Sequence, residues 1–506
     1  MSFVPDTQNK EFQDALNLIQ YTRQSVFLTG KAGTGKSTFL KYICANTKKK
    51  HVVLAPTGIA AINAGGSTLH SFFKLPFYPL LPDDPNFSLQ RGRIHEFFKY
   101  TKPHRKLLEE LELVIIDEIS MVRADIIDAV DRILRVYSRN LREPFGGKQI
   151  LLVGDVFQLE PVVKGDEREI LNRFYPTPYF FSARVFGQID LVSIELQKVY
   201  RQTDSKFIHV LDHIRNNTVG SAELQLLNTR YGTQIEQSEA DMYITLATRR
   251  DNVDYINDKK LAELPGDPVT FYGEIMGDFP ESSLPTSQEL VLKPGAQIIF
   301  IKNDFDRRWV NGTIGVISGF DPIEETLYVI TDDGKECDVK RESWRNIRYK
   351  YNEEKKQIEE EELGTFTQYP VRLAWAITVH KSQGLTFSRV VIDFTGGVFA
   401  GGQAYVASAA APRWKHPAEK AHQPCRCIRA SGDCQLLRTL QQPHRHRPCL
   451  EASTGRRSIR CRRQSLRQRG LRHFLDEFFK AIHSRYDIEK PNVQRLIRRK
   501  LNIINV

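Results

Sequence analysis

The stretch Ser25–Thr38, SVFLTGKAGTGKST, constrains the fold of this chain more than any other part of its sequence. A short apolar run, Val26–Leu28, leads into two glycines five positions apart that are followed by Lys and Ser, the pattern of a phosphate-binding loop between a strand and a helix. The glycines let the backbone turn tightly and bring its N–H groups against phosphate oxygens. The helix that follows points its positive end at the same anion. The sequence therefore predicts a site for a nucleoside triphosphate.

The polar residues of this loop have expected tasks in nucleotide binding. The Lys36 ammonium would neutralise the β- and γ-phosphates, and the Ser37 hydroxyl would hold Mg²⁺. A chance Gly-rich turn is the alternative, and the apolar run before the loop argues against it. The residues expected to contact the nucleotide are Gly30, Gly33, Thr34, Gly35, Lys36, Ser37 and Thr38.

Three further apolar runs end in polar residues, which predicts a parallel α/β sheet. They are His51–Ala55, Leu113–Ile116 and Gln149–Val153, and stretches of helical pattern separate them. In such a sheet the active residues lie at the carboxyl ends of the strands. Candidate catalytic residues are therefore sought directly after each run.

Asp117 and Glu118, which follow the Leu113–Ile116 run, are candidates for catalytic carboxylates. Two acids at a strand end can also cap the next helix. In a chain with a phosphate loop, we expect instead that Asp117 joins the Mg²⁺ shell and that Glu118 polarises the attacking water. Gln158, after the next strand, is positioned to sense the γ-phosphate through its amide.

A second α/β region is expected from about Leu191 onward. It contains the strand Tyr243–Ala247 and Arg201, a candidate arginine finger supplied from the second lobe, whose alternative is an ordinary surface arginine. Residues 291–347 change to short strands with Asn-Gly, Ser-Gly and Asp-Gly turns, a pattern typical of a small β-barrel. Residues 353–362 form a charge run, interpreted as a solvated linker.

The overall charge of the chain is misleading. The net charge is +11, but residues 408–472 hold 14 Arg and 2 Lys against 3 acidic residues, so the remainder has a net charge of −2. Basicity is therefore no evidence for a nucleic-acid partner.

Five of the seven cysteines fall between Cys425 and Cys461, yet their spacing fits none of the usual zinc knuckles, and no zinc is expected. The chain has no apolar run long enough to predict a membrane span.

The motifs together resemble superfamily-one helicases, and specifically the Pif-type family of 5′-to-3′ DNA helicases. The likeness covers about residues 8–407 and rests on GKAGTGKS, LAPTGIAA, TLHSFF, IIDEISM, GDVFQLEPV, YRQ, ITVHKSQGLTF and GGQAYVA, in that order. It implies an ATP- and Mg²⁺-dependent DNA helicase that translocates on single-stranded DNA and unwinds forked duplex DNA. It further implies a monomer that acts in DNA repair, replication, recombination or telomere maintenance. Such a protein would work at the bacterial nucleoid in the cytoplasm, or in the nucleus or mitochondrion of a eukaryote.

The resemblance also implies individual roles. Gln13 resembles the adenine-reading glutamine, and Gly384 is a further nucleotide contact. The residues implied for hydrolysis are Lys36, Asp117, Glu118, Gln158 and Arg201, with Ser37 and Asp117 at the metal. A groove for single-stranded DNA needs hydroxyl and backbone donors for phosphates and aromatic faces for bases. The residues that resemble its lining are Thr57, Gly58, Thr68, His70, Phe72, Thr378, His380, Lys381 and Ser382.

The family architecture implies a division into an α/β protein with two RecA-like parallel-sheet lobes and two insertions. The implied segments are 1–62 and 104–190 for the first lobe, 63–103 for a wedge, 191–270 and 366–407 for the second lobe, 271–365 for an SH3-like β-barrel and 473–506 for a C-terminal helical segment. The lobes would close on ATP and open after hydrolysis, moving the strand past the wedge. Two alternatives are a DNA-stimulated translocase with little unwinding, and a P-loop kinase or switch NTPase that ignores DNA.

Residues 408–472 depart from the family pattern. After GGQAYVA the family continues with Leu-Ser-Arg, whose arginine is a second finger on the γ-phosphate, whereas this chain reads SAAAPRWK. Back-translation with one base restored turns these eight residues into LSRCTSLE, and bases restored near Lys415 and His473 return family-like sequence. A basic nucleic-acid-binding tail is the alternative. We hypothesise a shifted reading frame, and we predict that this segment fails to pack into the second lobe and that the written chain binds ATP but hydrolyses it poorly.

Overall fold

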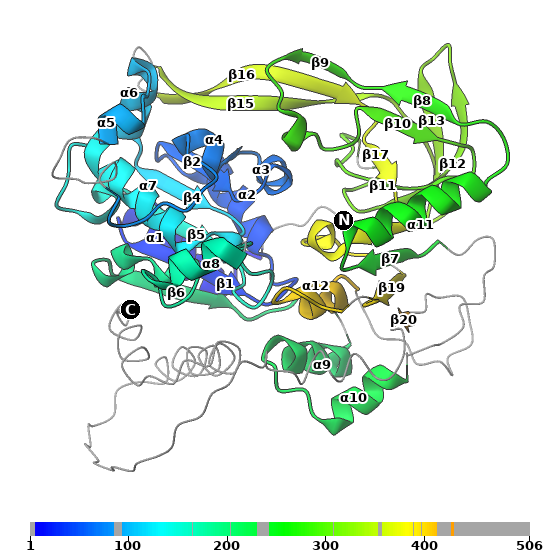
Figure 1. The fold of residues 1–506 in the computed structure, drawn as a ribbon, viewed down its shortest axis with the longest axis horizontal. Helices are drawn as coiled ribbons and strands as arrows, with labels where there is room; N and C mark the ends of the chain where they lie inside the picture. The colour runs from blue at the N-terminus through cyan, green and yellow to red at the C-terminus, as the bar shows by residue number, and fades with distance from the viewer. Residues whose placement is uncertain are drawn as a thin grey trace.

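The computed structural model describes residues 6–411, except residues 85–93, 164, 203, 230–241, 307, 353–356, 388 and 396, and also residues 427–429. Its described part holds two parallel sheets, antiparallel sheets inserted between strands of the second, and helices around them (Figure 1). The α/β class predicted from the sequence is confirmed. None of the helices in the described part is long and apolar enough to cross a membrane.

The first lobe is a parallel sheet in the order β3-β2-β4-β5-β1-β6. Alternate residues of a strand face opposite sides of a sheet, and here Val26 and Leu28 of β1 pack with α1 and α2, whereas Phe27 packs with α7. The sheet is therefore a middle layer between two layers of helices. Its strands are β1 (Ser25–Gly30), β2 (His51–Ala55), β3 (Ser67–Thr68), β4 (Leu113–Ile116), β5 (Gln149–Val153) and β6 (Leu191–Leu196). Its helices are α1 (Lys10–Tyr21), α2 (Lys36–Asn46), α3 (Gly58–Ala64), α4 (Leu69–Phe73), α5 (Ile94–Phe97), α6 (Lys102–Glu110), α7 (Ala124–Tyr137) and α8 (Gly165–Asn172).

Two predicted boundaries of this lobe differ from the structure. All six residues of β6 pair in parallel with β1, from Ser25–Leu191 to Gly30–Leu196, so the first lobe does not end at residue 190. Ser67 and Thr68, assigned to the wedge, pair with β2 at the opposite edge. Both are edge strands, and edge strands carry half-exposed polar residues that interrupt the continuous apolar pattern of central parallel strands.

The second lobe has the parallel sheet β18-β7-β19-β20. Its strands are β7 (Ile244–Ala247), β18 (Ala376–Thr378), β19 (Val390–Asp393) and β20 (Cys427–Arg429), and its helices are α9 (Ser205–Arg215), α10 (Ser221–Asn228), α11 (Arg250–Glu263) and α12 (Gln403–Ala409). The strand predicted at Tyr243–Ala247 is confirmed as β7.

The segment with the hypothesised shifted frame is only partly described. Ala409, Ala410 and Ala411 are buried in the core of the second lobe, and β20 pairs with β19. The prediction that residues 408–472 fail to pack into this lobe is therefore wrong for residues 408–411 and 427–429. The rest of that segment, and the C-terminal helical segment predicted at 473–506, lie outside the described residues.

An antiparallel sheet, β14-β13-β12-β11-β17, lies where short strands were predicted, with the pair β8–β10 beside it. Phe300, Trp309 and Tyr369 are buried in its core. The strands are β8 (Val269–Tyr272), β10 (Glu289–Leu292), β11 (Gln297–Phe300), β12 (Ile314–Asp321), β13 (Thr326–Thr331), β14 (Glu336–Val339) and β17 (Val371–Leu373).

A long hairpin arm extends from this region to the first lobe (Figure 1). It is built from β9 (Glu274–Gly277), β15 (Glu342–Asn352) and β16 (Gln357–Gln368). The interpretation of residues 353–362 as a solvated linker is therefore wrong for residues 357–362, because these acids lie opposite basic residues of β15: Arg348 contacts Glu361 at 2.6 Å. Near its end, Tyr349 is buried against Phe72, with ring centroids 5.9 Å apart, which joins the arm to the first lobe.

Candidate functional site

The phosphate loop follows β1 and ends where α2 begins at Lys36. Its three glycines have positive φ, and Gly33 and Gly35 lie in the left-handed region at +79° and +91°. A Cβ on Gly33 would lie 2.4 Å from the Cβ of Arg201, so only glycine lets the two backbones approach here. The Tyr200 N–H also donates to the Gly33 carbonyl at 2.8 Å. The loop is thus held against the segment that follows β6.

The Lys36 ammonium is held by backbone carbonyls of this loop. Its Nζ donates to the carbonyls of Gly30 at 2.7 Å and Lys31 at 3.0 Å. Burial lowers the pKa of Lys36, and the charges of Asp155 and Glu118 oppose that shift. A cation held near two carboxylates at a loop of backbone donors is suited to receive a polyphosphate that carries Mg²⁺.

Asp117 and Glu118 stand at the carboxyl end of β4, as the sequence predicted. The Asp117 carboxylate accepts the Glu118 N–H at 2.9 Å, and Glu118 has the strained φ of +48°. Burial, and next the charge of Asp117, raise the pKa of Glu118 to about 7, while burial raises the pKa of Asp117. A carboxyl whose pKa lies near neutral pH is an efficient general base.

Gln383, from the second lobe, closes the site over these acids. Its amide Nε2 donates to the Glu118 carboxylate at 2.8 Å and to the Gln158 side-chain oxygen at 3.2 Å. Three predicted or motif residues from separate segments therefore meet at one point. The sequence analysis gave Gln383 no catalytic role; the signal was its place in the polar loop ITVHKSQGLTF.

Arg201 lies between the phosphate loop and the second lobe. Its guanidinium donates to the carbonyls of Gly384 at 2.8 Å and Leu385 at 3.2 Å. Burial lowers its pKa. The prediction that Arg201 comes from the second lobe is corrected: it follows β6 of the first sheet and reaches across to the second lobe. Gly384 contributes its carbonyl to this contact.

Two ion pairs from α9 join the lobes beside the site, and the sequence analysis missed both. Arg215 donates to the carboxylate of Asp155 at 3.1 Å, with both side chains almost fully buried. Lys31 of the phosphate loop contacts Asp212 at 2.6 Å. The Tyr405 hydroxyl of α12 also accepts the Ala32 N–H at 3.0 Å. The only sign of these contacts in the sequence was the polar stretch GDVFQ directly after a strand.

The remaining nucleotide candidates are on α1, in the phosphate loop and in the first turn of α2. Gln13 is exposed on α1 and donates to the Thr7 carbonyl at 2.8 Å. The Thr34 hydroxyl is buried and donates to the Lys31 carbonyl at 2.9 Å. Ser37 is exposed and Thr38 is half-buried, both in the first turn of α2. Ser37 and Asp117 offer the hydroxyl and carboxylate oxygens that Mg²⁺ prefers.

The predicted DNA residues occupy matching places in the two lobes. Thr57 follows β2 and caps α3, while Thr378 is the last residue of β18 and caps the short helix Val379–Ser382, each through its side-chain oxygen. Thr68 caps α4 in the same way. Gly58 opens α3, and Lys381 lies beside Thr378, where burial lowers its pKa to about 8. Helix N-termini of this kind present N–H groups to phosphates.

Two predicted contacts to DNA are corrected. Phe72 is only 4% exposed and packs on Phe73, His104 and Tyr349, so its ring has no free face for a base. The Ser382 hydroxyl is buried and donates to the Val379 carbonyl at 2.8 Å, so it shapes the loop.

Exposed rings stand beside two predicted histidines instead. His70 stacks on Phe77 with ring centroids 5.0 Å apart, and His380 lies parallel to Phe399 at 6.3 Å. Phe77 is 84% exposed and Phe399 is 58% exposed. Neither was selected from the sequence, where only the aromatic-rich composition of residues 74–103 pointed to the first of them.

Comparisons with known proteins agree with this geometry. The profile of the PIF1-like helicase family matches residues 4–225. The human ATP-dependent DNA helicase PIF1 is 33% identical over 405 residues, which are 76% of this chain and 56% of that protein. The chain thus spans little more than half the length of this relative.

Two crystal structures from Bacteroides are more similar in sequence. Bacteroides sp Pif1 in complex with ADP-AlF4 is 42% identical with a TM-score of 0.72, and the match covers 80% of this chain and 90% of that one. Bacteroides Pif1 bound to ssDNA is also 42% identical, with a TM-score of 0.55 over 80% of this chain and 89% of that one. By these matches and by its phosphate loop, paired carboxylates and second lobe, the chain belongs to the PIF1-like helicase family.

Proposed function

We propose that this chain is an ATP-dependent 5′-to-3′ DNA helicase that moves along single-stranded DNA and unwinds forked duplexes. The observation that carries the proposal is the contact of second-lobe Gln383 with Glu118 and Gln158 of the first lobe. A site completed only when the lobes meet couples nucleotide state to lobe position. The binding of a nucleotide analogue and of single-stranded DNA by relatives of 42% identity supports the same function.

In this proposal each residue of the cleft has one task. Lys36 balances the charge of the β- and γ-phosphates, and Ser37 and Asp117 would hold Mg²⁺, which supplies charge neutralisation at the phosphates. Glu118 accepts a proton from the attacking water, and Gln383, which also contacts the Gln158 side-chain oxygen, orients that carboxylate. Arg201 stabilises the charge that develops on the γ-phosphate. Gln13 and Gly384 complete the nucleotide contacts.

The DNA groove is proposed to follow the helix N-termini of the two lobes. Thr57, Gly58 and Thr68 would grip backbone phosphates on the first lobe, and Thr378 and Lys381 on the second. His70 and His380, each beside an exposed phenylalanine, would offer stacking faces to bases. Because both grips move with their lobes, each ATP cycle shifts the strand by a small step past residues 69–103 and the arm.

ATP hydrolysis with and without single-stranded DNA tests this function. We expect DNA to stimulate hydrolysis by the chain and Lys36→Ala to abolish it, since this variant loses the ammonium group that balances the charge of the β- and γ-phosphates. Strand separation of a forked duplex is measured in parallel. Hydrolysis that DNA leaves unchanged, with the reading frame repaired, contradicts the proposal and favours a switch NTPase. Stimulated hydrolysis without strand separation identifies a translocase.

The shifted reading frame remains our hypothesis for residues 408–472. In the restored frame an arginine replaces Ala410. The Gln202 amide donates to the Ala409 carbonyl at 3.0 Å, and its oxygen would lie 3.0 Å from a Cβ on Gly33. The end of α12 is thus adjacent to the phosphate loop, which supports a second arginine finger there.

Sequencing the source DNA tests the hypothesis directly, and an uninterrupted frame refutes it. A functional comparison uses the written and repaired chains. We expect DNA-stimulated hydrolysis to be faster in the repaired chain by up to about 10³-fold, as for the gain of an arginine finger. Equal rates contradict the expected role of the arginine.

A further inference from the structure

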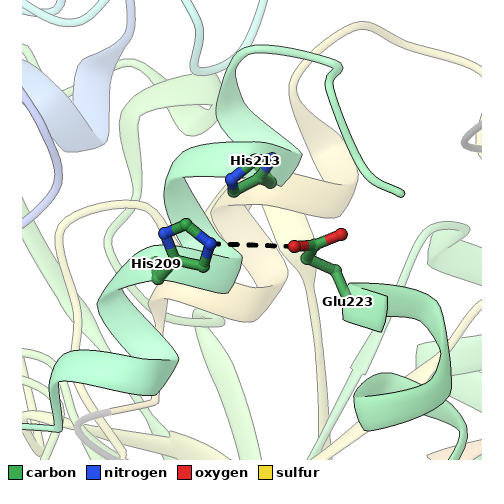
Figure 2. A group of neighbouring side chains, drawn as sticks. All are labelled: His209, His213 and Glu223. Atoms are coloured by element: carbon green, nitrogen blue, oxygen red, sulfur yellow. Dashed lines mark ion pairs between the residues drawn. The ribbon is translucent and has the colours of Figure 1, made fainter. Parts of the chain in front are cut away.

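A cluster of two histidines and one glutamate joins α9 to α10, on a different face of α9 from the residues that contact the first lobe. His209 and His213 are four residues apart and therefore lie on one face of α9, and Glu223 reaches them from α10 (Figure 2). The His209 Nε2 is 3.7 Å from a Glu223 carboxylate oxygen, and one ligand atom from each residue lies within 4.8 Å of the others. The two rings are 4.3 Å apart.

The second nitrogen of His213 is already fixed by a backbone contact. Its Nδ1 lies 2.9 Å from the Thr218 carbonyl and 3.1 Å from the Thr218 hydroxyl, and because a carbonyl can only accept, we assign the proton to Nδ1. The lone pair is therefore on Nε2. A histidine whose far nitrogen donates to a carbonyl is the usual arrangement of a metal ligand, since that bond sets both tautomer and ring orientation.

The Glu223 carboxylate is also held by a backbone contact. One carboxylate oxygen accepts the Gly220 N–H at 2.8 Å, which leaves the other directed at His209. An ion pair between Glu223 and His209 would explain the position of only one histidine ring. The structure places both rings near the same carboxylate.

We propose that His209, His213 and Glu223 bind a Zn²⁺ ion that ties α9 to α10. Two imidazoles and one carboxylate are a common zinc donor set, with the fourth position left to water, whereas Mg²⁺ and Ca²⁺ prefer oxygen ligands. A tetrahedral site with bonds near 2 Å needs its ligand atoms about 3.3 Å apart. His209 is exposed and can rotate inward to close the site, beside an open pocket of about 440 Å³ lined by Val210, Ala222 and Leu226.

The site has a structural consequence for the cleft. The adjoining face of α9 carries Asp212 and Arg215, which pair with Lys31 and Asp155 of the first lobe. A metal ion held by His209, His213 and Glu223 would fix α9 to α10 and to the loop between them. The helix that contacts the phosphate loop would thereby be held more rigidly in its lobe.

Zinc binding to the tag-free, full-length chain tests the proposal, with the cysteines of the C-terminal segment as the main interference. We expect His213→Asn to lose one equivalent of bound zinc, because the asparagine amide can still donate to the Thr218 carbonyl but offers no Nε2. His209→Ala should lose the same equivalent. Lys206→Ala, in the same helix and pocket, should keep it. Unchanged zinc stoichiometry in His213→Asn overturns the proposal.

Substitution of Co²⁺ for zinc separates this site from any cysteine site. A His₂Glu site gives cobalt bands without sulfur-to-metal charge transfer, and we expect only those bands to disappear in His213→Asn. We also expect zinc to raise the thermal midpoint of the wild-type chain more than that of the folded variant. If all bound cobalt shows thiolate absorption, the metal belongs to the cysteines and the proposal is wrong.

Discussion

Glu118 combines backbone strain, burial and a hydrogen bond from the other lobe. Its φ is +48°, its pKa is raised to about 7 and its carboxylate accepts from Gln383. A carboxyl whose pKa is higher in the folded than in the unfolded chain is stabilised by folding only in its protonated form. Its contribution to stability is therefore complete below about pH 4.5 and lost as the pH rises through about 7. The raised pKa, which would suit Glu118 to accept a proton, therefore lowers the stability of the folded chain at neutral pH.

Removal of the Gln383 amide should change the pH profile of hydrolysis. The Gln383 hydrogen bond lowers the pKa of Glu118, so in Gln383→Ala we expect the acidic limb of the kcat profile to move to higher pH, together with a lower kcat at pH 7. DNA-stimulated hydrolysis measured from pH 5.5 to 9 checks this. Gln197→Ala, an exposed glutamine, is the matched control. A lower kcat with an unmoved profile would show that Gln383 does not act through Glu118.

The two phenylalanines near His70 should separate DNA binding from stability. Phe77→Ala removes an exposed ring, and we expect weaker binding of single-stranded DNA by about 1–3 kcal/mol with unchanged unfolding. Phe72→Ala removes a buried ring, and we expect a loss of about 3–5 kcal/mol in the free energy of unfolding. Fluorescence anisotropy with an oligonucleotide and urea denaturation measure the two effects. Equal DNA affinity of Phe77→Ala and the wild type would exclude this ring from the groove.

At the scale of elements, the sequence predicted central strands well and edges poorly. β1, β4 and β5 are buried on both faces, so continuous apolar runs marked them and their polar ends marked Lys36, Asp117 and Gln158. Polar residues interrupt the sequence of β6, LVSIEL, and β16 begins within a run of charged residues. Neither pattern indicates which strand each of them pairs with. Contacts such as Arg215–Asp155 depend on how lobes dock, which no local pattern records.

Helix α9 makes two ion pairs with the first lobe, and these pairs differ in how deeply they are buried. Arg215→Met leaves the fully buried Asp155 carboxylate without its partner, and we expect a loss of about 3–5 kcal/mol in the free energy of unfolding. Asp212→Asn removes the more exposed pair with Lys31, and we expect a loss below about 1 kcal/mol. Urea denaturation of both variants gives the comparison. Similar losses would mean that burial does not decide the strength of these contacts.

At the scale of the molecule, the nucleotide cleft is assembled from both lobes while the positive charge is concentrated elsewhere. The residues proposed for hydrolysis converge from the segments that follow β1, β4, β5 and β6 and from the loop at Gln383. Outside residues 408–472 the chain has a net charge of −2, because that segment holds 16 of the 72 basic residues and only 3 of the 61 acidic residues. In the alternative interpretation, in which residues 408–472 are a basic nucleic-acid-binding tail, general attraction to DNA and grip on one strand belong to different parts of the chain.

This separation predicts that salt dependence and turnover can be changed independently. The variant Arg456→Gln, Arg457→Gln, Arg462→Gln, Arg463→Gln removes four charges from the basic segment. Each lost phosphate contact should flatten the plot of log affinity for single-stranded DNA against log salt by about 0.7, so the slope falls by up to about 2.8. The kcat at saturating DNA should stay unchanged, because Lys36 and Glu118 are untouched. A slope equal to that of the wild type would mean that the arginines do not reach the DNA and that the groove between the lobes accounts for all of the ionic contacts.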